Sequence, residues 1–155
     1  MNGRYVKTGI VLGSLVALVA TGCATGMKMG SGDVVADRQR LMKLNGASWA
    51  DVQAKAKAGN IDGIAVNAET IALNAMHIPM LFPEGSLTAK SNAKPEIWQK
   101  RPEFEAAAKN LLAEAEKLRD AAKAKNAEAT QALVKDFGRK TCGTCHTPFR
   151  VPPKS

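Results

Sequence analysis

Four segments of the chain place apolar residues three and four positions apart, which is the spacing of one face of an α-helix. They cover residues 33–58, 60–75, 102–122 and 126–150. Alanine is abundant and alternating β-branched runs are missing, so strands are not expected. Short turns join the first two segments and the last two, which favours antiparallel neighbours. We therefore predict an all-α fold, an up-down-up-down antiparallel four-helix bundle.

Residues that favour helix ends flank these segments. Asp33 suits the first turn of the first helix, and Gly59 suits its end. Asn60 is a candidate N-cap for the second helix. The third helix is expected to follow Pro102, and the fourth to begin near Asn126.

Residues 77–101 contain three prolines and form the longest predicted connection. Connections of this length in compact domains are usually functional or disordered. Its "IPMLFP" and "IW" stretches are apolar, so we expect it to pack against the bundle. Aromatic residues make up only 5% of the chain, and a bundle of mostly small side chains leaves room for a large apolar ligand.

The N-terminus has the features of an export signal. Arg4 and Lys7 precede an uncharged, mostly apolar run of 13 residues, 8–20, which is shorter than the roughly 20 residues of a membrane-spanning helix. The run ends in "ATGC", similar to the site at which bacterial lipoproteins are cleaved and lipidated. We predict a lipoprotein-type signal peptide at 1–22 and lipidation of Cys23. Ordinary cleavage nearby, leaving Cys23 as a plain thiol, is the alternative.

From Cys23 onward the chain has 133 residues, enough for one domain. We expect a flexible tether at 23–32, the helical domain at 33–152 and a short tail at 153–155. Loss of the signal lowers the formal net charge from +8 to +6. Export excludes an ordinary nucleic-acid partner, so the basic surface fits acidic proteins, anionic lipid headgroups, or simply a solvated lysine-rich face.

Cys142, Cys145 and His146 form a C-x-x-C-H motif near the end of the last helical segment. A thioredoxin-like pair would follow a strand, and none is expected. A structural zinc site usually needs four ligands, and only Cys23 and His77 remain. A Cys142–Cys145 disulfide would leave His146 without a role. Attachment of a c-type haem uses all three residues, through two thioethers and an iron-binding imidazole, and all three share one helix face.

A haem-attachment motif at the C-terminus of a helical bundle resembles the class II cytochromes c, the cytochrome c′ family. The resemblance covers about residues 33–152 and rests on "RQRLMKLNG", "LFPEGS", "KPEIWQ" and "CGTCHTPFR". Ordinary class I cytochromes place this motif near the N-terminus. The resemblance implies a four-helix bundle with one covalently bound haem c per chain. We expect it in the periplasm or on the outer face of the membrane, anchored by lipid at Cys23.

In this family, the residue four positions after the arginine of an R-Q-x-x pattern faces the distal side of the haem, and here it is Met42. High-spin cytochromes c′ carry a non-coordinating residue there and bind NO or CO, whereas the low-spin cytochrome c-556 type has a methionine that binds iron. Antiparallel helices at 33–58 and 127–150 would place Met42 about 24 Å and His146 about 28 Å from their shared end. We therefore predict the low-spin type, with His146 and Met42 as iron ligands.

Other residues compete for the sixth position on iron. Met76, at the end of the second helical segment, lies at a similar level, and Met80 follows just beyond. His77 would give a bis-histidine haem, but we expect an exposed imidazole there. Met27 and Met29 fall in the tether and are not expected to bind.

The resemblance also implies charged residues around the haem. Arg38 lies one turn before Met42, where its planar guanidinium can pair with a haem propionate. Gln39 is expected to assist it. Arg150 lies four residues after His146, on the proximal side, where the family has a basic residue.

Aromatic residues complete the expected surroundings. Phe137 and Phe149 are predicted to pack on the porphyrin. Phe82 and Trp98 either line the haem or fill the bundle. Lys140 is expected to be solvated, as part of a surface for docking.

These features predict a one-electron carrier that uses a His/Met haem and docks redox proteins at a lysine-ringed edge. The alternative is a high-spin protein that binds or sequesters NO or CO. An enzyme such as a peroxidase is not expected, because the residues near Met42 include Asn45 and Arg38 but no distal histidine. Family members also form antiparallel homodimers through their first two helices, and the apolar faces there allow it.

Overall fold

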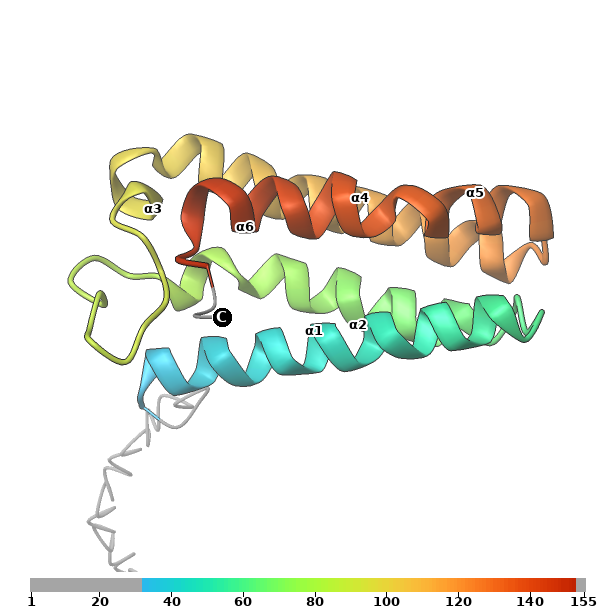
Figure 1. The fold of residues 1–155 in the computed structure, drawn as a ribbon, viewed down its shortest axis with the longest axis horizontal. Helices are drawn as coiled ribbons and strands as arrows, with labels where there is room; N and C mark the ends of the chain where they lie inside the picture. The colour runs from blue at the N-terminus through green and yellow to red at the C-terminus, as the bar shows by residue number, and fades with distance from the viewer. Residues whose placement is uncertain (1–31, 153–155) are drawn as a thin grey trace, which may run out of the picture.

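The computed structural model describes residues 32–152, and no named strand occurs among them. Helices α1, α2 and α4 and the final run of α5, η2 and α6 lie side by side and alternate in direction (Figure 1). The predicted all-α, up-down-up-down four-helix bundle is confirmed. The elements are α1 (Val34–Lys57), α2 (Ile64–His77), η1 (Pro79–Leu81), α3 (Glu96–Gln99), α4 (Arg101–Lys123), α5 (Ala127–Phe137), η2 (Gly138–Gly143) and α6 (Thr144–Phe149).

Several predictions fall outside the described residues and stay predictions. They concern the signal peptide at 1–22, lipidation of Cys23, the tether apart from Gly32, and the tail at 153–155. Within residues 32–152, no helix combines the length and the apolar character needed to cross a membrane.

Capping residues set several of the helix ends. The Asp33 carboxylate accepts hydrogen bonds from the N–H groups of Val35 (2.9 Å) and Ala36 (3.2 Å), so it caps α1 rather than lying in its first turn. Gly59 follows α1 with a φ of +73°, a conformation that glycine adopts without steric cost. The fourth helical segment begins next to Asn126, as predicted, and the Asn126 side chain caps α5.

The prediction that Asn60 caps the second helix is wrong by three residues, because α2 begins at Ile64 and its N-cap is Gly63. The Asn60 side chain accepts a hydrogen bond from the N–H of Gly63 at 3.1 Å, so it holds a turn before the helix. Its own N–H donates to the Lys55 carbonyl at 3.0 Å, which completes the end of α1. Pro102 lies in the first turn of α4 rather than before it.

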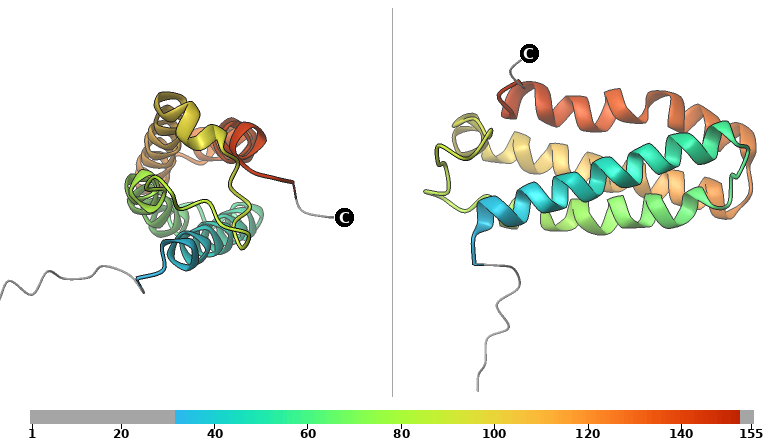
Figure 2. Two further views of the ribbon diagram at one scale, coloured as in Figure 1. Left: turned by 90° about the vertical axis from the view of Figure 1, so that its left-hand side faces the viewer. Right: turned by 60° about the horizontal axis from the view of Figure 1, so that its bottom comes forward.

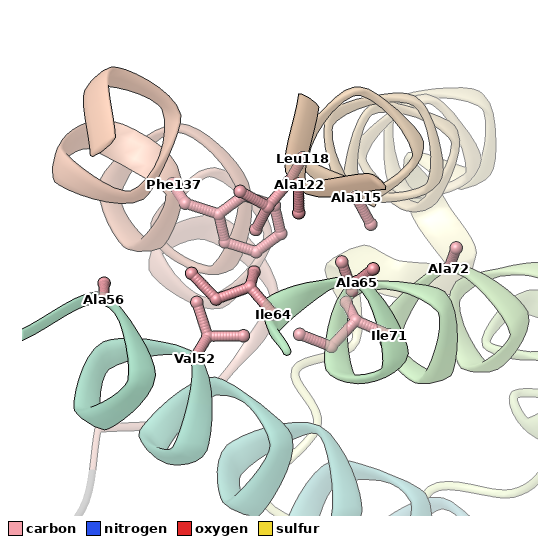
Figure 3. Close-up of a cluster of buried hydrophobic side chains, with 11 residues drawn as sticks. Val52, Ala56, Ile64, Ala65, Ile71, Ala72, Ala115, Leu118, Ala122 and Phe137 are labelled. Atoms are coloured by element: carbon pink, nitrogen blue, oxygen red, sulfur yellow. The ribbon is translucent and has the colours of Figure 1, made fainter. Parts of the chain in front are cut away.

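Helices α2 and α4 form the most extensively packed pair in the bundle. Alanines face each other across this contact, and small side chains let the two backbones approach closely (Figure 3). This core lies toward the end of the bundle where the α1–α2 and α4–α5 turns are found. Its buried members are Val52, Ala56, Ile64, Ala65, Ala68, Ile71, Ala72, Ala115, Leu118, Ala122 and Phe137.

At the other end of the bundle, the backbones of α1 and of the C-terminal run of η2 and α6 do not pack against each other. Helix α1 makes backbone contacts with α2, α5 and η1, but with neither η2 nor α6 among the described elements. The connection from α2 to α4 crosses this end of the bundle (Figure 2). The packing therefore leaves α1 and α6 apart, on either side of the region that this connection covers.

The long connection packs inward, as its apolar stretches predict. Ile78, Phe82 and Ile97 are buried and join a second apolar cluster with Phe104 and Phe149. An isolated bridge pairs Ala93 with Arg150, the Lys94 N–H donates to the Phe149 carbonyl (3.0 Å), and the Val151 N–H donates to the Asn92 carbonyl (2.8 Å). The connection is thus fastened to the C-terminal end of α6.

Candidate functional site

Two adjoining cavities lie between α1 and α6. The larger has a volume of about 540 Å³ and the smaller of about 120 Å³. The larger falls within the range of about 300–1,000 Å³ that is usual for small-molecule sites. Both cavities are lined by Met42 and Gly46 from α1 and by Cys145 and His146 from α6.

The C-x-x-C-H motif forms the wall on the α6 side. Cys142 lines the smaller cavity, and Cys145 and His146 line both, so the three side chains share a face as predicted. The backbone is not one uninterrupted α-helix, because residues 138–143 form the π-helical turn η2. The Thr141 hydroxyl donates to the Phe137 carbonyl at 2.7 Å within this turn. Such turns occur often at functional sites, because they redirect side chains.

Burial changes the acid–base properties of the motif. It raises the pKa of the Cys145 thiol, and together with the smaller effect of the neighbouring Cys142 brings it to about 11. It also lowers the pKa of His146, as does the positive charge of Arg150. The imidazole is therefore held in its neutral form, the form that ligates metals.

The structure separates the four candidates for the sixth iron ligand. Met42 is half-buried and lines both cavities. Met76 and Met80 are 57% and 66% exposed, and neither lines a cavity. His77 is also exposed, and its Nδ1 lies 2.8 Å from the Leu73 carbonyl oxygen. Met42 is thus the one of these four residues that lines the same two cavities as His146.

Arg38 is buried, with 4% of its surface exposed, and lines the larger cavity. Its terminal nitrogens donate four hydrogen bonds to the α2–α4 connection, where the acceptors are the Leu81 carbonyl (3.3 Å), the Ser86 hydroxyl (3.0 Å) and carbonyl (2.8 Å), and the Ser91 hydroxyl (2.7 Å). The guanidinium also lies 4.7 Å from the centre of the Phe82 ring. Burial lowers its pKa, and the charge of Asp33 opposes that effect. Arg38 therefore fastens the connection to α1 while remaining a cation at the cavity wall.

Polar and basic side chains surround the mouth of the larger cavity. Gln39, Lys43 and Arg150 line it, and the Gln39 amide donates to the Lys90 carbonyl at 2.9 Å. Lys140 lines neither cavity. It is exposed and forms an ion pair with Asp136.

The predicted aromatic residues divide between the two cavities. Phe149 and Phe82 line the larger one. Phe137 lines the smaller one and stacks on Trp49, with ring centres 4.9 Å apart. Trp98 lines neither, and its indole N–H donates to the Pro83 carbonyl at 2.9 Å, so it supports the connection from outside.

Sequence reasoning missed Gly46, Ile97 and Phe104 as cavity residues. A Cβ added to Gly46 would meet no atom within 4 Å, so the glycine keeps open the space between the two cavities. A glycine inside a helix costs about 1 kcal/mol relative to alanine, and that cost was the signal available in the sequence. Ile97 and Phe104 are ordinary apolar residues, and only the tertiary fold distinguishes them.

The walls fit a flat apolar cofactor with anionic groups at one edge. Apolar side chains form most of the larger cavity, and Arg38, Lys43 and Arg150 bring positive charge to it. Two thiols and a neutral imidazole lie together on one wall, with a thioether on α1. Two thiols and an adjacent imidazole are the donor set that holds a covalently attached haem.

Comparison with known proteins agrees with this geometry. Residues 33–150 match the family model described as Cytochrome C′. A cytochrome c-556 from Agrobacterium tumefaciens (strain II Chrys) is 36% identical over 120 residues, which cover 76% of this chain and 96% of the relative. A cytochrome c′ from Pararhodospirillum photometricum is 38% identical over 93 residues, 56% of this chain and 69% of the relative. The solved cytochrome c′ of Rubrivivax gelatinosus has a TM-score of 0.68 and 26% identity, covering 77% of this chain and 95% of that one.

Proposed function

Because the chain belongs to the cytochrome c′ family, we propose that it is an exported one-electron carrier with a low-spin haem between His146 and Met42. Its cofactor is covalently attached haem c, which supplies a one-electron iron couple. The observation that carries the proposal is the placement of Met42. It lines the same cavities as His146, whereas Met76, Met80 and His77 line neither.

Each residue of the site has a role in this proposal. Cys142 and Cys145 would hold the macrocycle through thioether bonds, and His146 would supply an imidazole nitrogen from the same wall. Met42 would supply its sulfur to the iron from the opposite wall, and would thereby keep small molecules from binding the iron on that side. A site closed on both sides by the protein exchanges electrons with little rearrangement.

The remaining side chains would orient the cofactor and limit its contact with water. Phe149 lines the larger cavity and Phe137 the smaller one, so the two rings would pack on the macrocycle. Arg38 would provide positive potential for a propionate while holding the connection closed, and Gln39 and Arg150 would assist at the mouth. The basic mouth would meet an acidic redox protein in a small, transient interface.

A gas-binding cytochrome c′ is the second candidate. The smaller cavity favours it, because its volume of about 120 Å³ adjoins Met42 and would admit a diatomic molecule if the sulfur moved. Asn45 lines this cavity and is already paired, since its amide oxygen accepts a hydrogen bond from Asn74 at 2.8 Å. No histidine or carboxylate lines the smaller cavity opposite His146, so peroxidase-like acid–base chemistry is not part of the proposal.

Export and assembly are also part of the proposal. We expect cleavage before Cys23, lipidation of that residue, and a periplasmic or outer-face location, which mass spectrometry of the membrane fraction can check. We also expect a homodimer through the first two helices, where Leu44, Val66 and Leu73 are 48%, 71% and 50% exposed. Analytical ultracentrifugation of the wild type and of Val66→Glu tests the dimer.

The visible spectrum of the purified haem-loaded protein, oxidised and reduced, with and without CO, tests the proposed electron carrier. Sharp, split bands on reduction that CO leaves unchanged are expected. Broad high-spin bands that shift when CO is added would overturn the proposal and favour the gas-binding candidate.

A further inference from the structure

Three potential metal ligands project from one short segment on the outside of the bundle. Met76 and His77 close α2, and Met80 lies in η1, immediately beyond. All three are exposed, while Ile78 between them is 3% exposed and lines the smaller cavity. Exposed methionines are unusual, because burial of this apolar side chain in a core is energetically favourable.

The backbone keeps these side chains on one face. Ile78 has φ −52° and ψ −51°, so the chain continues in a helical path from α2 into η1. Met76 and Met80 are therefore helical neighbours four positions apart, and His77 and Met80 are neighbours three positions apart. Because η1 is a 3₁₀ turn, in which residues three apart lie nearly one above the other, His77 and Met80 project in similar directions, with Met76 about 100° from His77.

The His77 ring is already oriented for metal binding. Its Nδ1 lies 2.8 Å from the Leu73 carbonyl oxygen, which can only accept a hydrogen bond. Nδ1 therefore carries the proton, and in the neutral ring the lone pair is on Nε2. Metal-binding histidines are commonly fixed in this way, with one nitrogen donating to a backbone carbonyl and the other free for the metal.

Arg101 holds the segment that carries Met80. Its guanidinium donates to the carbonyls of Pro79 and Phe82, both at 2.8 Å, on either side of that methionine. Glu105 forms an ion pair with Arg101 at 2.8 Å, which offsets the positive charge beside the site. The ligands thus lie on a braced backbone rather than on a free loop.

From this arrangement we propose that Met76, His77 and Met80 form a surface site for one monovalent copper ion, Cu(I). Two thioethers and an imidazole are soft donors, and thioethers select Cu(I) over harder cations. Zinc is disfavoured, because residues 32–152 contain no group of three His, Cys, Asp or Glu side chains that could hold it. The site is separate from the haem cavities and does not depend on the proposed electron transfer.

The test is anaerobic titration of reduced, haem-loaded protein with Cu(I), in competition with a colorimetric Cu(I) chelator. Haem attachment consumes the thiols of Cys142 and Cys145, and a Cys23→Ser background removes the remaining one. We expect one Cu(I) per chain, with shifts in the NMR signals of the His77 ring and of the Met76 and Met80 methyl groups. The substitutions Met76→Leu, Met80→Leu and His77→Ala should each weaken binding by about tenfold or more.

Leucine keeps the approximate size and apolar character of methionine but removes the sulfur. The two leucine variants therefore test the loss of a metal ligand rather than the loss of apolar surface. Leu87→Ala, which alters an exposed apolar residue of the α2–α4 connection without removing a donor, should leave Cu(I) affinity unchanged. The proposal is overturned if the chelator retains all the Cu(I). It is equally overturned if a variant that combines Met76→Leu, His77→Ala and Met80→Leu binds Cu(I) as tightly as the parent, since the ion would then be held elsewhere.

Discussion

Met42 on α1 and His146 on α6 line the same two cavities, although their helices make no backbone contact with each other. The space between them is therefore a pair of cavities rather than a helix–helix contact. Under the proposed His/Met ligation, the identity of residue 42 decides whether the iron has a sixth protein ligand.

Met42→Leu should convert the haem from low-spin to high-spin, because leucine fills a similar volume but offers no donor atom. We expect the reduced protein to lose its split bands and to bind CO. Met42→His should stay low-spin and have a lower reduction potential, since methionine ligation raises it. Met76→Leu and Met80→Leu are the matched controls and should leave the spectrum unchanged. Low-spin bands that persist in Met42→Leu would show that another residue holds the iron.

Arg38→Lys should destabilise the fold by about 1–3 kcal/mol, because one ammonium group cannot reach every oxygen that the guanidinium now satisfies. Urea unfolding measures the loss of stability. Hydrogen exchange at the backbone amides of Ser86 and Ser91 should show that the α2–α4 connection loosens before the helices unfold. Arg40→Lys is the control. That side chain is 70% exposed and pairs with Asp37, so the change should stay below about 0.5 kcal/mol. Equal effects of the two substitutions would contradict a bracing role for Arg38.

Gly46→Ala and Gly46→Leu should differ sharply in how much haem the purified protein carries. An added Cβ meets no atom within 4 Å, so alanine should be accepted and should favour the helix by up to about 1 kcal/mol. A leucine side chain would extend into the space that both cavities share and compete with the cofactor. The ratio of haem to protein absorbance after purification measures this, and full loading of Gly46→Leu would argue against a haem at this position.

Asn126→Ala should cost about 1 kcal/mol of stability, because the Asn126 side chain caps α5 by accepting a hydrogen bond from the Ala129 N–H at 3.0 Å. Asn126→Gly should cost only a few tenths of a kcal/mol, since glycine exposes the helix end to water. Thermal unfolding of the two variants side by side gives the comparison. A larger loss for glycine than for alanine would be inconsistent with a capping role.

The pKa of Asp136 should lie below its ordinary value of about 3.9, because Lys140 and Arg139 both contact the carboxylate, at 3.0 and 3.1 Å. A depressed carboxyl pKa means that the stabilisation is present above the unfolded-state pKa and is lost as the pH falls through the folded-state value. Carboxyl-carbon NMR titration reports the midpoint directly. Lys140→Gln should raise it, and an unchanged midpoint would mean that the ion pair is absent in solution.

Sequence periodicity predicted the four helices and their order because each helix buries an apolar stripe whose spacing follows from helical geometry. The start of α2 was missed, since Asn60 can either cap a helix or hold a turn before one. The π-helical turn at 138–143 was missed because it depends on the local hydrogen bonds of Thr141 rather than on a residue pattern.

The motif residues could be found from the sequence because their chemical types and spacing are specific. Met42 was indicated by the family's R-Q-x-x pattern, and the structure places it at both cavities. The contacts of Arg38 could not be found from the sequence. Its partners Ser86 and Ser91 are small polar residues in an irregular connection, and only the path of that connection brings them to α1. Ile97 and Phe104 were missed for a similar reason, since any apolar residue could have filled their places.

The connection between α2 and α4 is fastened to α1 through Arg38 and to the end of α6 through Ala93 and Lys94. The connection therefore links the two helices that carry Met42 and His146. Inserting or deleting a residue in this stretch would change the span between Met42 and His146 while leaving both helices intact. Under the proposed His/Met ligation, a change in the length of a surface segment could thus tighten or release the bond from Met42 to the iron, with no substitution at either ligand.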